Sequence, residues 1–161
     1  MNNRIKSLAD ALEVTLQGRP WYGKPVYTLL DEADPGRVFL SPAPGAHRAI
    51  DILYHMVTWA TFVLHRVEGN EVYDQAAMEQ LDWREIDPSV HGWEEGIAEL
   101  VATHQQILAH LREKDDSFLE QKVDFREYNF HFLINGLMQH NIYHAGQIAY
   151  LAKLLEDNSN K

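Results

Sequence analysis

Two histidines near the C-terminal end of the chain, His140 and His144, stand where a helix is expected to carry buried apolar residues. With Leu137 and Ile148 they recur at spacings of three, four and four residues, the spacing of a core-facing helical stripe. Side chains at i and i+4 lie one turn apart on one face, so both imidazoles can reach a single metal ion. A hydrogen-bonded pair of core histidines fits the pattern equally, because a buried imidazole must satisfy both ring nitrogens. The spacing therefore predicts either a metal site or a polar pair in the core.

Two further histidines are candidates for a third ligand. His55 lies in a segment that is apolar almost all round, and His104 replaces an apolar residue in the stripe of another predicted helix. His47 lies about 80° from the His55 face, taking about 100° per residue. His65 lies on another face, so both are weaker candidates. The residue pattern alone leaves His55 and His104 as alternatives.

The helical face of His55 also carries residues predicted to line a substrate pocket. Asp51, Trp59 and Phe62 fall within about 40° of this histidine at about 100° per residue. Trp59 and Phe62 are expected to form apolar walls of the pocket. Asp51 is the candidate for a catalytic base, or for an acceptor that orients the histidine. Gln147, one turn beyond the second histidine of the C-terminal pair, is a candidate for orienting a bound ligand.

Two glycines of the C-terminal segment are predicted to have different roles. Gly136 lies on the His140 face, where the missing side chain leaves room either for a ligand or for close packing of another helix. Gly146 faces away from His144 and is expected at a close crossing with another helix or another subunit. Together with the apolar character of residues 46–67, these small residues predict a homodimer.

The elements that must position these side chains are all predicted to be helices. Amphipathic periodicity marks four long helices, at residues 4–16, 46–67, 93–113 and 128–156. The connection over residues 19–45 holds five of the six prolines, and Pro25 is expected to open a short helical turn there. Residues 70–89 are expected to be irregular or short helical material without catalytic residues. The prediction is a single all-α domain over residues 1–161, a four-helix bundle with a long proline-rich connection after helix one.

Composition narrows the function classes. The 161 residues are 45% hydrophobic, enough for one domain with a real core. Cysteine is absent, which excludes disulfides, thiolate ligands and a cysteine nucleophile, and leaves histidine and carboxylates for metal binding. The net charge of −10, without a basic cluster, argues against nucleic acid as a partner. No membrane span and no signal peptide are recognised, so we expect a cytoplasmic protein without a membrane partner.

Several segments together resemble the DinB-like superfamily, bacterial helical-bundle proteins often called metal-dependent hydrolases. The resemblance spans most of the chain, and its most specific segment is residues 140–148 (HNIYHAGQI). The other matching parts are Tyr22-Gly23 followed by Val26, residues 46–56 (AHRAIDILYHM) with Trp59, residues 66–69 (RVEG) and Trp93. In that family one histidine of the second helix and two of the fourth bind the metal. The resemblance therefore implies His55, His140 and His144 as the ligands.

The resemblance also implies a range of functions. The family name refers to induction of the founding member by DNA damage, which suggests a stress response and implies no polymerase activity. Some branches resemble thiol-dependent S-transferases that use a low-molecular-weight thiol such as bacillithiol or mycothiol. We therefore expect a metal-dependent enzyme, a hydrolase or a thiol S-transferase, that acts on a small molecule with a divalent ion, zinc or nickel. The alternative is a non-catalytic, metal-stabilised or ligand-sensing homodimer.

Overall fold

The computed structural model describes residues 4–70 and 75–157, and within them the chain forms helices and no strand. The predicted all-α class is therefore confirmed. Residues 71–74, part of the connection predicted to be irregular, lie outside the described residues. The elements are α1 (Arg4–Gln17), α2 (Val26–Asp31), α3 (Ala49–Glu68), α4 (Gln75–Leu81), α5 (Trp93–Glu113), the 3-10 helix η1 (Asp116–Glu120) and α6 (Phe130–Asp157).

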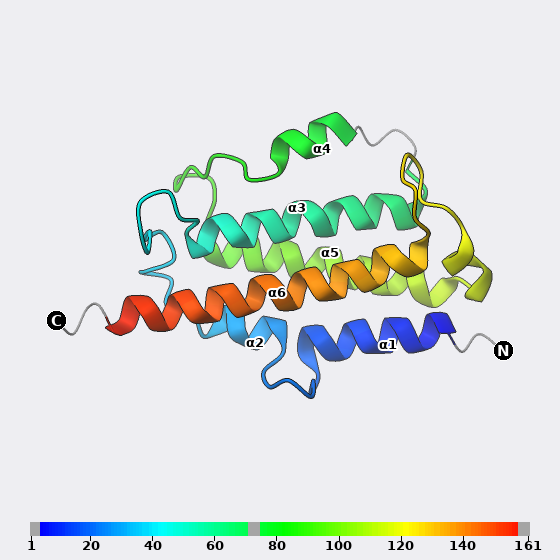
Figure 1. Ribbon diagram of the computed structural model, residues 1–161, viewed down its shortest axis with the longest axis horizontal. Helices are drawn as coiled ribbons and strands as arrows, with labels where there is room; N and C mark the ends of the chain where they lie inside the picture. Colours follow the sequence, from blue (N-terminus) through cyan, green and yellow to red (C-terminus); the bar gives the residue numbers. More distant parts are fainter. Residues whose placement is uncertain (1–3, 71–74, 158–161) are drawn as a thin grey trace.

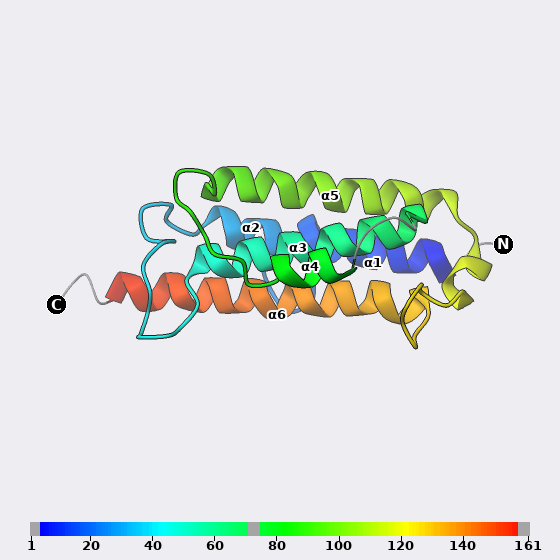
Figure 2. The same cartoon turned by 90° about the horizontal axis from the view of Figure 1, so that it is seen from above.

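The long helices α1, α3, α5 and α6 run along the long axis of the molecule (Figure 1). Seen from above, α5 and α6 lie on opposite sides, and α3 lies between them (Figure 2). Helix α3 packs against both α5 and α6, which explains why its sequence is apolar almost all round. This burial within one chain removes the apolar character of α3 as an argument for a second subunit.

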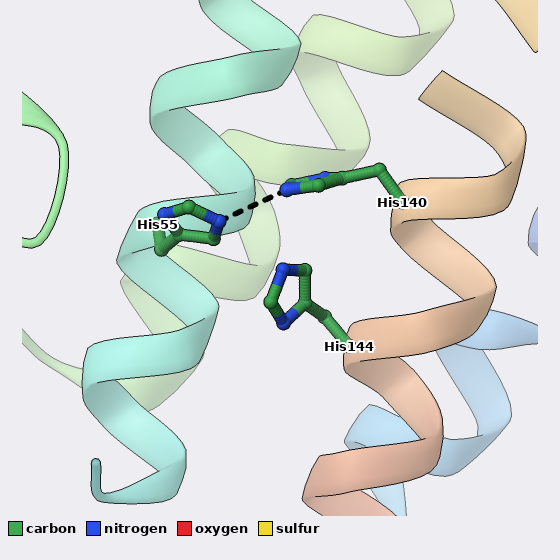
Figure 3. A group of neighbouring side chains, drawn as sticks. All are labelled: His55, His140 and His144. Atoms are coloured by element: carbon green, nitrogen blue, oxygen red, sulfur yellow. Dashed lines mark hydrogen bonds between the residues drawn. The ribbon is translucent and has the colours of Figure 1, made fainter. Parts of the chain in front are cut away.

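Local sequence signals fix the ends of α3. At its start, the Asp51 carboxylate accepts a hydrogen bond from the Arg48 backbone N–H at 2.7 Å, so the helix begins at Ala49, three residues later than predicted. At its end, Gly69 adopts the left-handed conformation with φ 75°, which a glycine enters without steric cost. Between these ends, α3 carries His55 on the side that faces α6 (Figure 3).

The other helices follow the predicted pattern closely. Helix α5 has the predicted bounds, and α2 begins directly after Pro25, as expected for a proline that opens a helix. Helix α6 begins two residues later than predicted. There the Asn129 side-chain oxygen accepts the backbone N–H of Phe132 at 3.0 Å.

The segment after α4, residues 82–84, and the last residue of α4 are held against α3 by hydrogen bonds. The Thr58 hydroxyl on α3 donates to the Leu81 carbonyl at 3.1 Å and accepts from the Arg84 guanidinium at 2.5 Å. These bonds place residues 82 and 83 beside the helix face that carries His55. Among the described residues, no helix has both the length and the apolar character needed to cross a membrane.

Candidate metal centre

Three histidines from two helices converge between α3 and α6. His55 comes from α3, His140 and His144 come from α6, and their rings point toward one another (Figure 3). One nitrogen of each ring lies within 4.8 Å of the others, and the Nε2 atoms of His55 and His140 are 2.9 Å apart. The structure thus brings together the three residues implied as metal ligands.

Acceptors behind two of the rings determine which nitrogen carries the proton. The Nδ1 of His55 lies 2.5 Å from Asp82 Oδ1, and the Nδ1 of His144 lies 2.7 Å from Gln147 Oε1. Each oxygen accepts a hydrogen bond, so the proton sits on Nδ1 and the lone pair sits on Nε2. This arrangement, with an acceptor behind the imidazole, is the usual support of a metal-bound histidine.

The spacing of the rings fits a shared cation. Tetrahedral coordination with bonds of about 2.0–2.1 Å separates ligand nitrogens by about 3.3–3.4 Å. The 2.9 Å between His55 and His140 therefore needs to open by only a few tenths of an ångström, roughly the tolerance of such bonds. A hydrogen bond between these two rings would account for two histidines, whereas a shared ion also accounts for His144. The buried Nδ1 of His140 has no hydrogen-bond partner among the described residues.

Burial keeps the three rings neutral. It lowers the pKa of His140 to about 3, and it also lowers the pKa of His55 and His144 below the ordinary value for histidine. For His55 the nearby Asp82 carboxylate opposes this shift, but burial is the larger effect. A neutral imidazole is the form that binds a metal ion, so the cluster is ready to coordinate without losing protons.

The segment after α4 supplies two residues of the site that the sequence analysis missed. Asp82 accepts hydrogen bonds from His55 and, at 3.2 Å, from the Trp59 indole N–H. Trp83 is stacked between His55 and His47, with ring centroids 3.9 and 3.8 Å away. The expectation that residues 70–89 hold no site residue is therefore wrong. No helical periodicity connects them to His55, because they reach it through a loop.

Trp83 also carries an unusual backbone conformation. Its φ of 41° is in the left-handed region, which costs a residue with a side chain about 1–2 kcal/mol. The ring stacking and the bond from the neighbouring Arg84 to Thr58 hold it there. Strain of this kind persists where the surroundings fix the chain, and it is frequent at functional sites.

Two residues predicted for the site lie elsewhere. The Asp51 carboxylate forms an ion pair with Arg48 at 2.6 Å. Burial raises the pKa of Asp51, but the hydrogen bonds from Arg48 outweigh this and hold the pKa below its ordinary value. Phe62 is buried in the core edge-on to Trp59, at 5.7 Å between ring centroids. The carboxylate beside His55 is Asp82 rather than Asp51.

His104, the rival third ligand, lies in the core on α5. Its Nδ1 is 3.2 Å from the Tyr27 hydroxyl, and its Nε2 is 3.0 Å from the side-chain nitrogen of Asn141. Both ring nitrogens are therefore used within the protein. The structure places His55, and not His104, with the pair on α6.

The three histidines border a cleft of about 750 Å³. Trp59 and Gln147, two of the residues predicted for a substrate pocket, line it, and so do Asp82, Trp83 and His47. Clefts of this size hold small molecules rather than macromolecules. The cleft walls are thus formed by α3, α6, the connection before α3 and the segment after α4.

Comparison with known protein families places this chain in a family. The family model described as the DinB superfamily matches residues 25–148, from the start of α2 into the second half of α6. The matched range contains all three converging histidines and the segment with Asp82. No curated protein and no solved structure matches the chain.

Proposed function

This chain belongs to the DinB superfamily, and we propose that it binds a divalent metal ion, zinc or nickel, through His55, His140 and His144. The observation that carries this proposal is the convergence of three neutral imidazoles from α3 and α6 on one space. The acceptors Asp82 and Gln147 support it, because they direct the lone pairs of two rings inward. We describe α1, α3, α5 and α6 as the four-helix bundle that holds this centre.

We propose that the metal centre belongs to an enzyme of the hydrolase or thiol S-transferase type. A divalent ion held by three imidazoles supplies a Lewis acid with an open position, which favours the deprotonated form of a water molecule or a thiol. Asp82 and Gln147 hold the ligand rings in the required tautomer and orientation. Trp59 and Trp83 provide apolar walls that limit the access of bulk water to the cleft.

The lining of the cleft favours a low-molecular-weight thiol as one partner and a small electrophile as the other. Asp82 is the carboxylate among the described lining residues, and it already accepts from His55 and Trp59. A deprotonated thiol is itself a strong nucleophile and needs no further base. The thiol sulfur would form a bond to the electrophile as the bond to the leaving group breaks. We assign to His47, which lies on the outer face of Trp83, the role of accepting the thiol proton and donating it to the leaving group.

Metal analysis of purified protein tests the centre. We expect about one equivalent of metal in the wild type and less than about a tenth of that in His140→Ala and His144→Ala, because two nitrogen ligands do not hold such an ion tightly. His131→Ala removes an exposed histidine of the same helix and is the matched control. Equal metal content in all four proteins would remove the site.

Turnover separates an enzyme from a binding protein. The metal-loaded protein is incubated with thiols and model electrophiles, and separately with esters and amides. We expect thiol consumption that His47→Gln reduces while the metal content stays unchanged. No turnover in either panel would favour the non-catalytic alternative.

We also propose that the protein is a homodimer that pairs through the face of α6 that carries Tyr143, Gly146 and Tyr150. The two tyrosines are 64% and 67% exposed, and both also line the cleft beside the three histidines, so a partner on this face would border the cleft. A Cβ built at Gly146 meets no atom within 4 Å, so this glycine does not mark a crossing with another described helix of the chain. Exposed aromatic rings beside a glycine suit close approach of a second helix. Light scattering at the monomer mass of 18.6 kDa would contradict this proposal.

A further inference from the structure

A second hollow of about 210 Å³ lies at the interface between α3 and α6, beside the cleft that the three histidines border (the metal cleft). Its described walls are mostly apolar, with Val63, Leu133 and Leu137 among them. Trp59 and His140 border both hollows. Their ring centroids are 6.2 Å apart at an angle of 60°, so these two rings form the wall that the hollows share.

The hollow depends on the missing side chain of Gly136. A Cβ built at this glycine meets no atom within 4 Å, and the glycine lines the hollow. Of the two roles predicted for Gly136, room for a ligand therefore fits the structure, and close packing of another helix does not. A large side chain at this position would fill the hollow without a shift of the backbone.

We propose that this hollow binds the apolar arm of a small molecule whose reactive end lies at the three histidines. The inference rests on the proposed function and adds the substrate class: a thiol or an electrophile that carries a short alkyl chain or a phenyl ring. An apolar cavity of about 150 Å³ is large enough for benzene, so about 210 Å³ admits a group of this size. The apolar walls exclude a charged arm, because its desolvation would not be compensated.

The shared wall argues for an arm of the substrate as the occupant. A molecule that reaches past the His140 ring from the metal cleft enters the hollow directly. Phe132 at the outer edge of the hollow is 62% exposed, so the edge is open to solvent and accessible to a chain end. A second protein copy would instead cover the outer edge and leave the interior of the hollow empty.

Binding of ethanethiol, butanethiol and hexanethiol to zinc-loaded protein, measured by calorimetry, tests the proposal. Each methylene that enters the hollow should strengthen binding by about fourfold, the ratio that corresponds to burial of one methylene group. Gly136→Phe should remove this gain while ethanethiol still binds as in the wild type. His131→Phe is the matched control, since it adds the same ring to the same helix at an exposed position that lines neither hollow.

The measurements distinguish failure of this inference from failure of the metal site. If the wild type holds zinc and binds ethanethiol, but chain length has no effect or has the same effect in all three proteins, the hollow is not a substrate compartment. If Gly136→Phe lowers the mass in light scattering and leaves the chain-length effect intact, the hollow is a subunit contact and the proposal is wrong. A wild type that holds no zinc contradicts the proposed function itself.

Discussion

The core of this protein contains two arrangements of buried histidines, and they differ in the use of their ring nitrogens. In His104 on α5, one ring nitrogen forms a hydrogen bond with Tyr27 and the other forms one with Asn141. In His55 and His144, the nitrogen that faces away from the cluster forms a hydrogen bond, with Asp82 and Gln147 respectively. Their other nitrogens face a common space. The core histidine and the proposed ligands thus differ in the direction of the lone pairs that remain.

The comparison shows that burial and pKa alone cannot identify a metal ligand. Burial lowers the pKa of both His104 and His140 to about 3. The two rings are therefore alike in charge, and only their partners separate them. The convergence with His55 and His144 is the property that His104 lacks.

Removal of the metal should have the largest effect and should act on the cluster alone. A ligand at about a thousand times its dissociation constant stabilises the folded state by about 4 kcal/mol. For a chain of this length we expect EDTA to lower the Tm by about 10 °C, measured by calorimetry. His140→Ala should show no EDTA effect, whereas His131→Ala should respond as the wild type does. An EDTA effect that survives in His140→Ala would place the metal elsewhere.

His104→Ala should show the opposite behaviour, with a large loss of stability and no loss of metal. The substitution leaves a cavity and deprives Tyr27 and Asn141 of a buried partner, and we expect a cost of about 3 kcal/mol in the free energy of unfolding. Denaturant unfolding measures the cost, and metal analysis of the folded fraction should still give the wild-type content. Loss of metal in this variant would mean that the two arrangements act as one network.

Asp82→Ala should weaken metal binding by removing the hydrogen-bond acceptor of the His55 ring. Without its acceptor, the His55 ring loses its fixed tautomer, and metal affinity should fall by about 10- to 100-fold, as measured in competition with a chromophoric chelator. Asp51→Ala is the control, because Asp51 caps α3 and pairs with Arg48. It should cost about 1 kcal/mol of stability and leave the affinity unchanged. The reverse result would restore Asp51 as the carboxylate of the site.

The two carboxylates also show what the sequence could and could not predict. Helical periodicity places Asp51 and His55 within about 40° on one face, but it does not reveal that Arg48 draws the Asp51 carboxylate to the start of α3. His140 and His144 were predictable because their relation depends on one helix. Asp82 and Trp83 were not, since a loop delivers them and its path depends on contacts such as the bond between Thr58 and Leu81.

The same limit applies to the glycines and to Phe62. The spacing predicts the face on which Gly136 lies, but whether a neighbour fills the space beside it depends on the shapes of two helices. Phe62 shares the predicted face with Trp59, yet only Trp59 borders the cleft. One turn along α3 therefore separates a pocket wall from a core residue, and periodicity alone does not place that boundary.

The smallest predicted effect is the pH dependence of stability that is caused by His104, the histidine whose ring nitrogens both have partners in the core. In the folded protein the pKa of His104 is about 3, whereas in the unfolded chain it returns to about 6.5. Below about pH 6.5 His104 binds a proton in the unfolded state but not in the folded state. Its contribution to the free energy of unfolding is therefore fully present above this pH and is lost as the pH decreases. Each such histidine contributes a slope of about 1.4 kcal/mol per pH unit.

Denaturant unfolding of EDTA-treated protein between about pH 6.5 and pH 5 measures this slope. The neutral rings of the cluster add to it in the wild type, because burial lowers their pKa values as well. His104→Gln removes one titrating ring and offers an amide to Tyr27 and Asn141. The average slope over this window should therefore decrease by about 1 kcal/mol per pH unit, while the contribution of the cluster remains. An unchanged slope would mean that His104 takes up its proton in the folded state. Its hydrogen bonds would then not be what separates His104 from the three histidines of the cluster.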